Sequence, residues 1–156
     1  MIISSKKKLK EIIDQAQEQN KKVLIKKGVF DIIHPGHIHS INEFKKAADL
    51  VIIFIQSSFL TKKEKGEKKP INSSKHRAQV IDGIRNVDYV YIDKSKSMEE
   101  SLSLLEYLKP DIIAIVKKRK TKKYDRPYWE LKEFPDKNKQ IFSTSNIINK
   151  IIKKIS

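Results

Sequence analysis

The chain has 156 residues and a formal net charge of +15, with 34 Lys and Arg against 19 Asp and Glu. It contains no cysteine, which excludes disulfides and thiolate metal sites. This length suits one domain with a sizeable core. The first residues lack an apolar stretch of signal-peptide length, and the longest apolar run, Leu50–Ile55, is too short to cross a bilayer. We therefore expect a soluble cytoplasmic protein without membrane insertion.

The positive charge is spread along the whole chain rather than gathered in one segment. A strongly basic chain invites a polyanionic partner, such as nucleic acid or a nucleotide. Isoleucine is over-used together with lysine, as a genome-wide codon bias would produce. No nucleic-acid motif accompanies the charge, so we do not expect a nucleic-acid partner, and a functional meaning of the charge stays open.

Predicted helices and strands alternate along the chain. Amphipathic spacing favours a leading helix and four more, the last with Ile147, Ile148, Ile151 and Ile152 facing inward, at 6–20, 36–48, 74–85, 98–108 and 143–155. Apolar runs favour buried strands at 23–25, 50–55, 88–92, 111–116 and 140–142. Among the connections we expect a polar loop, a basic exposed stretch and a short helix, over 59–74, 117–123 and 126–134.

This alternation is typical of an α/β fold. It predicts a single Rossmann-like domain over residues 1–156, with a parallel sheet of about five strands and helices on both faces. In such sheets ligands bind beyond the carboxyl ends of the strands, where the strand order switches. The run from Gly28 to His37 follows the strand at 23–25 and is therefore the first candidate for a site.

The run Gly28-Val29-Phe30-Asp31-Ile32-Ile33-His34-Pro35-Gly36-His37 places two histidines at the start of a helix. Unpaired N–H groups and the helix dipole make this an anion site. The histidines suit a phosphate that gains charge during a reaction. A metal site is the alternative, but Pro35 and Gly36 separate the histidines and no third ligand is near, so no metal ligand is expected.

The same run resembles the signature of the cytidylyltransferase-like nucleotidyltransferases. Further matches follow in the family's order, at Lys65-Gly66-Glu67, Pro70-Ile71-Asn72, Arg77, Val87-Asp88-Tyr89-Val90, Lys109-Pro110-Asp111 and Ser143-Thr144-Ser145. The ordered set is most similar to the heptose 1-phosphate adenylyltransferases of lipopolysaccharide-core biosynthesis. The resemblance covers nearly the whole chain.

The resemblance implies an enzyme that transfers a nucleotidyl group, AMP from ATP, to a phosphorylated small molecule such as heptose 1-phosphate, and releases pyrophosphate. It implies catalytic roles for His34, His37 and Lys65, and a substrate-phosphate contact for Arg77. The nucleotide-binding residues that it implies are Gly28, Val29, Phe30, Asp31, Gly36, Ser143, Thr144 and Ser145. Asp31 is expected to orient the loop as a helix cap. The family's Mg²⁺ arrives with the ATP or CTP substrate, bound by phosphates and water, and dimers are common in the family.

Two segments depart from the family's pattern and leave the substrates open. Gln56-Ser57-Ser58 stands where a Ser-Asp pair is usual, and Val116, Lys117 and Lys118 replace a glycine-rich run beside the base. The base, the acceptor and turnover itself are therefore in question. The alternatives are a cytidylyltransferase acting on glycerol 3-phosphate or another alcohol phosphate, an FAD-synthetase-like adenylyltransferase, and a non-catalytic nucleotide-binding protein.

Overall fold

A six-stranded sheet forms the centre of the protein in a computed structural model that describes residues 1–115, 124–134 and 143–155. Every strand pairing is parallel, and the strand order is β1-β4-β3-β2-β5-β6. In chain order the strands are β1 (Ile2–Ile3), β2 (Val23–Gly28), β3 (Leu50–Gln56), β4 (Tyr89–Asp93), β5 (Ile112–Ile115) and β6 (Glu130–Glu133). The predicted parallel α/β architecture is confirmed.

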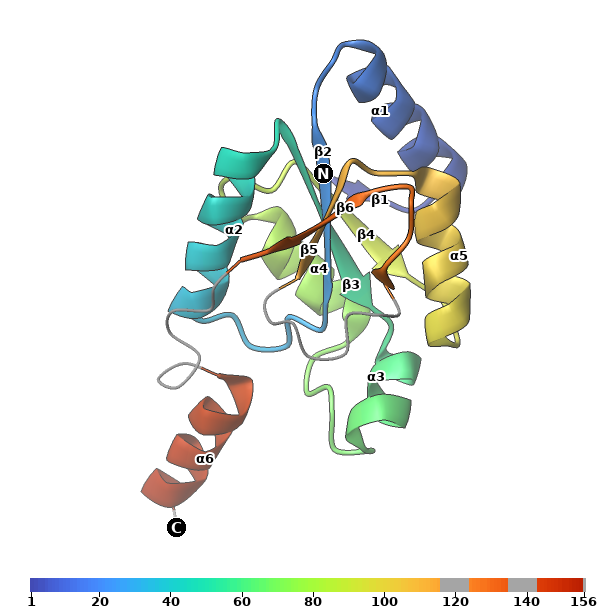
Figure 1. The fold of residues 1–156 in the computed structure, drawn as a ribbon. Helices are drawn as coiled ribbons and strands as arrows, with labels where there is room; N and C mark the ends of the chain where they lie inside the picture. The colour runs from blue at the N-terminus through green and yellow to red at the C-terminus, as the bar shows by residue number, and fades with distance from the viewer. Residues whose placement is uncertain (116–123, 135–142, 156) are drawn as a thin grey trace.

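Helices cover both faces of this sheet (Figure 1). Helices α1 (Lys6–Glu18) and α5 (Met98–Leu108) lie on one face, and α2 (Pro35–Ala47) and α4 (Ser74–Asp82) on the other. The short helix α3 (Ser58–Lys65) follows β3, and α6 (Thr144–Ile155) lies away from the sheet. Two layers of helix over a parallel sheet account for the continuous apolar runs in the strands.

Strand β3 shows how the sheet supplies both halves of the core. Its side chains alternate between the two faces. Ile53 and Ile55 pack with Phe44 of α2 and Ile81 of α4, whereas Phe54 packs against the face that carries α1 and α5. All these side chains are fully or almost fully buried. The burial fixes the strand register, because a shift of one residue would exchange the two faces.

The predicted 59–74 loop is wrong in its first half, where α3 extends from Ser58 to Lys65. The side chain of Ser57 accepts a hydrogen bond from the backbone N–H of Leu60, and Leu60 and Thr61 are buried. A cap and one buried turn therefore hold a helix in a segment too lysine-rich to show an apolar period.

The predicted helix over 126–134 is also wrong, since residues 130–133 form strand β6 at the edge of the sheet. The sequence Glu-Leu-Lys-Glu favours a helix by intrinsic propensity. Its pairing with β5, which places Ile113 beside Leu131, and the burial of Trp129 outweigh that preference. Strand β1 was not predicted, because two residues carry no periodic signal.

The C-terminal helix begins close to the predicted position but does not pack as predicted. None of the α6 side chains is buried, and those of Ile151 and Ile152 are about half exposed, at 51% and 52%. An apolar stripe predicts which side of a helix is apolar, not where the helix lies in the fold. The predicted strand at 140–142 and basic stretch at 117–123 lie outside the described residues.

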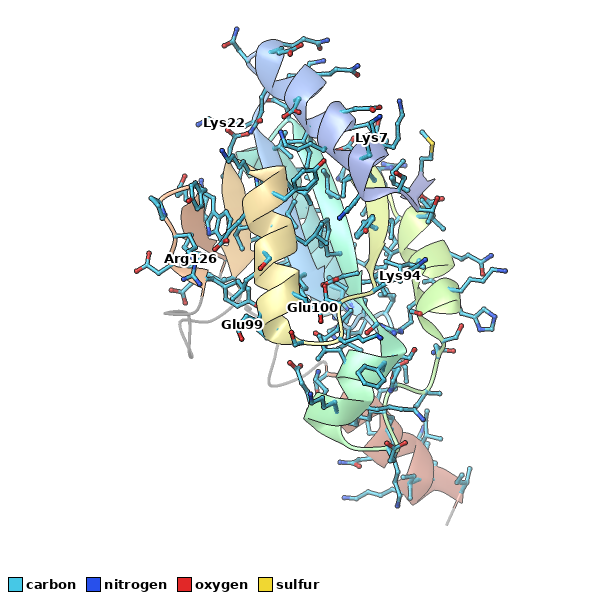
Figure 2. All side chains as sticks on the ribbon, turned by 90° about the vertical axis from the view of Figure 1, so that its right-hand side faces the viewer. Lys7, Lys22, Lys94, Glu99, Glu100 and Arg126 are labelled. Atoms are coloured by element: carbon cyan, nitrogen blue, oxygen red, sulfur yellow. The ribbon has the colours of Figure 1, made fainter. Side chains whose placement is uncertain are left out.

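Charged side chains of both signs lie on the outer surface around α1 and α5. Figure 2 shows Lys7, Lys22 and Lys94 on this side together with Glu99 and Glu100. All five are exposed, so this face does not form a patch of one sign. None of the helices within residues 1–115, 124–134 and 143–155 combines the length and apolar character that a membrane crossing requires.

Candidate active site at the carboxyl end of β2

A pocket of about 410 Å³ opens at the carboxyl end of the central strand β2. The chain runs from β2 to β3 on one side, whereas β5 pairs with the other side of β2. Strand order therefore switches at β2, which is where open α/β sheets bind ligands. The volume lies in the range of small-molecule sites, which is roughly 300–1,000 Å³.

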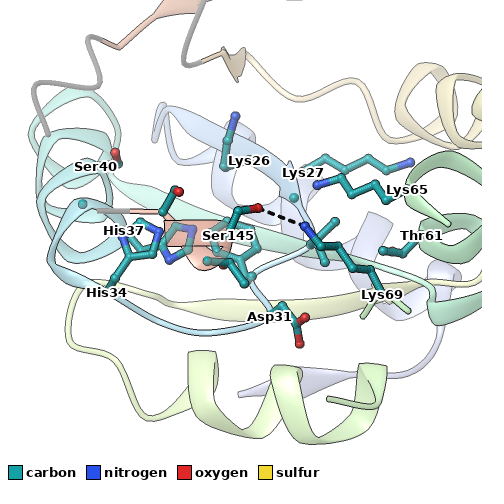
Figure 3. A pocket seen from close by; sticks show the side chains of 16 residues that line it. Lys26, Lys27, Asp31, His34, His37, Ser40, Thr61, Lys65, Lys69 and Ser145 are labelled. Carbon is teal, nitrogen blue, oxygen red and sulfur yellow. Dashed lines mark hydrogen bonds between the residues drawn. The ribbon is translucent and has the colours of Figure 1, made fainter. Parts of the chain in front are cut away.

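The pocket collects almost every residue that the sequence singled out (Figure 3). The end of β2, the β2–α2 loop and the start of α2 contribute Gly28, Val29, Phe30, Asp31, His34, Gly36 and His37. The end of α3 contributes Lys65, and the start of α6 contributes Ser143, Thr144 and Ser145. Segments more than a hundred residues apart in the chain thus meet around one cavity.

The loop after β2 is shaped by a close contact between Gly28 and Phe30. Phe30 has φ of 51°, which is unusual for a bulky residue. A Cβ atom on Gly28 would lie 2.7 Å from Cε2 of the Phe30 ring. In the structure the missing side chain of Gly28 thus gives room to the Phe30 ring. The glycine therefore acts on the site through the shape of the loop.

Helix α2 begins at the pocket without a side-chain cap. Its N-cap residue is His34, whose side chain makes no capping hydrogen bond, and Pro35 stands in the first turn. The first turn contains no acidic residue. The backbone N–H groups at a helix start need acceptors and lie at the positive end of the helix dipole. An anion in the pocket would satisfy both requirements.

The two motif histidines stack against each other beside this helix start. Their ring centroids lie 3.8 Å apart with an interplanar angle of 22°, and the Phe30 ring lies 5.1 Å from that of His37. Burial, His34 and Lys26 together lower the pKa of His37 to about 4. No group in the described part of the chain hydrogen-bonds to its buried Nδ1 atom. His37 is therefore neutral at pH 7, with a ring nitrogen that a ligand can engage.

Lysines line the pocket on two sides, although Lys65 is the only lysine that the sequence led us to expect there. Lys26 and Lys27 at the end of β2, and Lys69 after α3, also line the cavity. The Nζ atom of Lys69 donates to Ser145 Oγ at 2.9 Å, as the dashed line in Figure 3 marks. We did not predict Lys26 and Lys27 as pocket residues, because we expected the strand to end at Ile25, whereas β2 continues to Gly28. Ser40 and Thr61 were missed as well.

The adjacent lysines of β2 differ in their partners. Lys27 forms an ion pair with Asp93 at 2.8 Å, in which the two side chains are only 6% and 1% exposed. Burial acts to raise the pKa of Asp93, but Lys27 and hydrogen bonds from Ser101 and Ser95 outweigh it and lower that pKa. Lys26 donates instead to the carbonyl oxygen of Ala114 at 3.1 Å. Lys27 thus ties β2 to β4, whereas Lys26 ties it to β5.

The start of α6 forms the far wall of the pocket. Ser143 Oγ accepts a hydrogen bond from the backbone N–H of Asn146 at 3.2 Å, so this helix is capped by its own side chain. Ser143, Thr144 and Ser145 all line the pocket. A second helix N-terminus therefore faces the same cavity as the start of α2.

Asp31 lines the pocket but does not cap a helix, so that prediction is wrong. Its carboxylate accepts hydrogen bonds from the backbone N–H groups of Ile71 and Asn72, at 2.8 and 2.9 Å. These residues lie in the α3–α4 loop, and the N-cap of α2 is His34. The side chain of Asp31 therefore joins two loops across the site.

Arg77 is placed differently from its predicted role in phosphate binding. Its side chain is almost fully buried, at 1% exposure, and it is absent from the pocket lining. Its guanidinium donates to the backbone carbonyls of Val29, Gln56 and Asn72. A guanidinium held by backbone oxygens in this way cannot reach a substrate phosphate without leaving its own partners. The structure therefore places the Arg77 guanidinium against backbone carbonyls rather than in the pocket lining.

The departures from the family pattern fall on different parts of the structure. Gln56 is buried at the end of β3, where its amide donates to Glu64 at 2.9 Å, and Ser57 caps α3. Ser58 lies next to Arg77, with its hydroxyl within 3.3 Å of Nη2. The segment with Val116, Lys117 and Lys118 lies outside the described residues.

The described side chains offer little to a resident metal ion. Within these residues no three His, Asp or Glu side chains form a group that could hold one. Asp31 is the carboxylate among the residues that line the pocket, and backbone N–H groups already occupy it. The donor set, which is rich in lysine and histidine, suits an anion instead.

The parallel sheet with helices on both faces and a pocket at the switch in strand order define an α/β protein of Rossmann-like topology. Residues 25–151 match the family described as Cytidylyltransferase-like, and the chain belongs to that family. The predicted family is thereby confirmed. The match includes the β2–α2 loop, the lysines after α3 and the start of α6.

Curated relatives come from bacteria and archaea. The chain is 36% identical over 112 residues to the bifunctional protein HldE of Marinomonas sp.. The aligned region covers 71% of this chain and 23% of that protein. It is 46% identical over 88 residues to the FAD synthase of Pyrococcus horikoshii, covering 56% of this chain and 57% of the relative. The chain thus spans about a quarter of the first relative and just over half of the second.

A solved structure supports the fold. The lipopolysaccharide core biosynthesis protein from Thermoplasma volcanium matches with a TM-score of 0.54 and 24% identity, covering 85% of this chain and 88% of the other. At this identity the likeness concerns the arrangement of strands and helices.

Proposed function

We propose that this protein transfers a nucleotidyl group from a nucleoside triphosphate, ATP in the first place, to a phosphorylated small molecule. The acceptor in this proposal is a sugar phosphate such as heptose 1-phosphate. The observation that carries the proposal is one cavity that gathers two histidines, two helix N-termini and several lysines. Such a site can hold a triphosphate along its length.

The proposed step is a substitution at the α-phosphorus. An oxygen of the acceptor phosphate attacks the α-phosphorus, and a new P–O bond forms. The bond between the α-phosphorus and the bridging oxygen to the β-phosphorus breaks, and its electron pair leaves with pyrophosphate. Charge therefore grows on the leaving group, and hydrogen-bond donors aimed there lower the barrier.

The pocket residues supply donors rather than nucleophiles. His34 and His37 lie beside the open start of α2, and each ring carries an N–H group that can donate to a phosphate oxygen. Lys65 and Lys69 on the opposite side provide cations for the developing negative charge. Ser143, Thr144 and Ser145 add hydroxyl and backbone donors from α6. Positioning and charge stabilisation are the whole of their proposed contribution.

Magnesium enters this proposal as part of the substrate. In the family's chemistry Mg²⁺ neutralises charge on the nucleoside triphosphate, and it would arrive bound to phosphate oxygens and water. Among the described residues that line the pocket the carboxylate is that of Asp31, and the backbone N–H groups of Ile71 and Asn72 donate to it. The protein residues therefore act on the complex through its phosphates.

A second candidate acceptor is FMN, which would make the protein an FAD synthase. The 46% identity to the Pyrococcus horikoshii FAD synthase over 88 residues favours it. The chemistry is the same, because FMN is also a phosphate monoester that accepts AMP. The two proposals differ in the acceptor and share the triphosphate site.

Pyrophosphate release tests the proposal. ATP, CTP, GTP and UTP are each combined with heptose 1-phosphate, FMN and glycerol 3-phosphate, in the presence of Mg²⁺. Release with ATP and a sugar phosphate supports the first proposal, release with ATP and FMN the second, and release with CTP and glycerol 3-phosphate a cytidylyltransferase. A folded protein that binds nucleotide and releases no pyrophosphate with any pair would instead be a non-catalytic nucleotide-binding protein.

A further inference from the structure

Two loops meet at the pocket and carry different parts of its chemistry. The β2–α2 loop leads into His34 and His37, and the α3–α4 loop follows Lys65 and contains Lys69. The triphosphate reaction proposed above needs both sets of donors at fixed positions around one phosphate chain. What fixes the two loops relative to each other therefore matters for the reaction.

Arg77 connects the two loops from beneath. Its Nη1 atom donates to the carbonyl of Val29 in the β2–α2 loop, and its Nε atom donates to that of Asn72 in the α3–α4 loop at 3.0 Å. Its Nη2 atom donates to the carbonyl of Gln56 at the end of β3, also at 3.0 Å. One planar group thus holds the β2–α2 loop, the α3–α4 loop and the end of β3 together.

Asp31 connects the same two loops by accepting hydrogen bonds, whereas Arg77 connects them by donating. Its carboxylate accepts from the backbone N–H groups of Ile71 and Asn72, and its backbone carbonyl accepts from the side-chain amide of Asn72 at 3.1 Å. Asp31 also provides a negative charge near the buried guanidinium of Arg77. The negative charge of Asp31 therefore offsets part of the cost of burying the Arg77 guanidinium.

We propose that Arg77 and Asp31 are positioning residues that hold the histidine-bearing loop and the lysine-bearing loop in register for nucleotidyl transfer. This inference rests on the proposed function. Neither residue needs to touch the reacting atoms. Both act by fixing backbone atoms, Val29 on one side and Asn72 on the other. A displacement of about 1 Å between such donors can cost on the order of 100-fold in rate.

The geometry distinguishes arginine from lysine at position 77. A guanidinium presents five N–H donors in a rigid plane, whereas an ammonium offers three from a single point. Arg77→Lys keeps the charge but cannot span the carbonyls of Val29, Gln56 and Asn72 at once. The lysine variant therefore removes the connection between the loops while it keeps a buried positive charge.

The test compares Arg77→Lys, Arg77→Ala and Asp31→Asn with the control Arg85→Lys, which changes an exposed arginine beyond α4. For Arg77→Lys we expect kcat of pyrophosphate release to fall by about 10- to 100-fold, with KM for ATP changed by less than about threefold because the phosphate-binding groups remain. Added guanidinium ion should restore part of the kcat lost in Arg77→Ala. The control should match the wild type.

Two further measurements do not depend on turnover. In Asp31→Asn the backbone amides of Ile71 and Asn72 should exchange with solvent faster, and the NMR signals of the His34 and His37 rings should shift. Unmoved signals and unchanged exchange would overturn the proposal even if the protein proves inactive with every substrate pair. Wild-type kcat in Arg77→Lys would overturn it as well, and so would a loss of activity that equals the loss of folded protein.

Discussion

Helices α2 and α5 both follow strands of the same sheet, yet they begin in opposite ways. Ser97 caps α5 by accepting a hydrogen bond from the backbone N–H of Glu100 at 3.1 Å, and Glu99 and Glu100 stand in its first turn. Figure 2 shows both glutamates at that end of the helix. Helix α2 has His34 as its N-cap, with no capping hydrogen bond from the side chain and no acidic residue in its first turn.

The difference separates a helix start completed by its own chain from one that awaits a ligand. A serine cap and acidic side chains satisfy the N–H groups and the dipole of α5 without a partner. In α2 the His37 N–H donates to the His34 carbonyl at 2.9 Å, but no side chain caps the start and its first turn has no acidic residue. This start lies at the wall of a pocket that also holds Lys65 and Lys69. The absence of a cap thus indicates function where the surrounding charges are positive.

The largest expected effect comes from removing one donor beside the open helix start. His37→Ala should lower kcat/KM for pyrophosphate release by about 100- to 1,000-fold, because one preorganised donor to the phosphates is lost. His76→Ala, which changes an exposed histidine of α4, is the matched control and should keep wild-type activity. Equal activities of the two variants would contradict the claim that the start of α2, unlike that of a capped helix, takes part in the reaction.

The pH dependence of stability tests the burial of His37. Its pKa is about 4 in the folded protein and 6.5 without perturbation, so the unfolded chain binds the proton more readily. The stability that this group contributes is therefore present above pH 6.5 and lost as the pH falls through 4, by about 3 kcal/mol. Denaturant unfolding between pH 7 and pH 4 should show a shallower loss for His37→Gln than for the wild type. Identical curves would contradict the burial of a neutral ring.

Exchanging the two kinds of helix start should separate stability from activity. Ser97→Ala removes the cap of α5 and should lower the free energy of unfolding by about 1 kcal/mol, with pyrophosphate release unchanged. His34→Ser should abolish most activity while unfolding stays within about 1 kcal/mol of wild type, because a new cap offsets the lost ring stacking. Thermal or denaturant unfolding measures the stability of both variants, and the pyrophosphate-release assay measures their activity. Loss of activity in Ser97→Ala would argue against the distinction.

The smallest expected effect concerns the electrostatic influence of Lys26 on the pKa of His37 at the open helix start. Burial is the largest cause of the lowered His37 pKa, followed by His34 and then Lys26. Lys26→Met should therefore raise the pKa of His37 from about 4 towards 6.5 without reaching it. NMR titration of the ring protons measures this. Lys22→Met, at the opposite end of β2 and exposed, should leave the titration unchanged.

Most of the fold and of the pocket wall followed from local patterns in the sequence. The α5 boundaries at Met98 and Leu108 agree with the prediction, and the Lys109-Pro110 pair is the local signal that marks the end of this helix. The glycine and histidine spacing after β2 likewise identified the loop that lines the pocket. These signals lie within a few residues of each other, so no long-range contact was needed to interpret them.

The failures share a dependence on contacts between distant segments. Arg77 looks like a phosphate ligand until Val29, Gln56 and Asn72 surround it. Strand β6 exists because β5 lies beside it. Lys27 joins the site through a strand that continues three residues beyond its apolar part. Such roles arise from tertiary pairing, which single-sequence periodicity does not contain.

The most direct test is an NMR titration of the isotopically labelled protein with Mg²⁺ and ATP. The account predicts that the ring signals of His34 and His37 and the backbone amide of Gly36 shift in a saturable way, whereas the amides of Glu99 and Glu100 at the capped start of α5 remain in place. Shifts at Glu99 and Glu100 without shifts at the start of α2 would contradict the assignment of the open helix N-terminus as the triphosphate site.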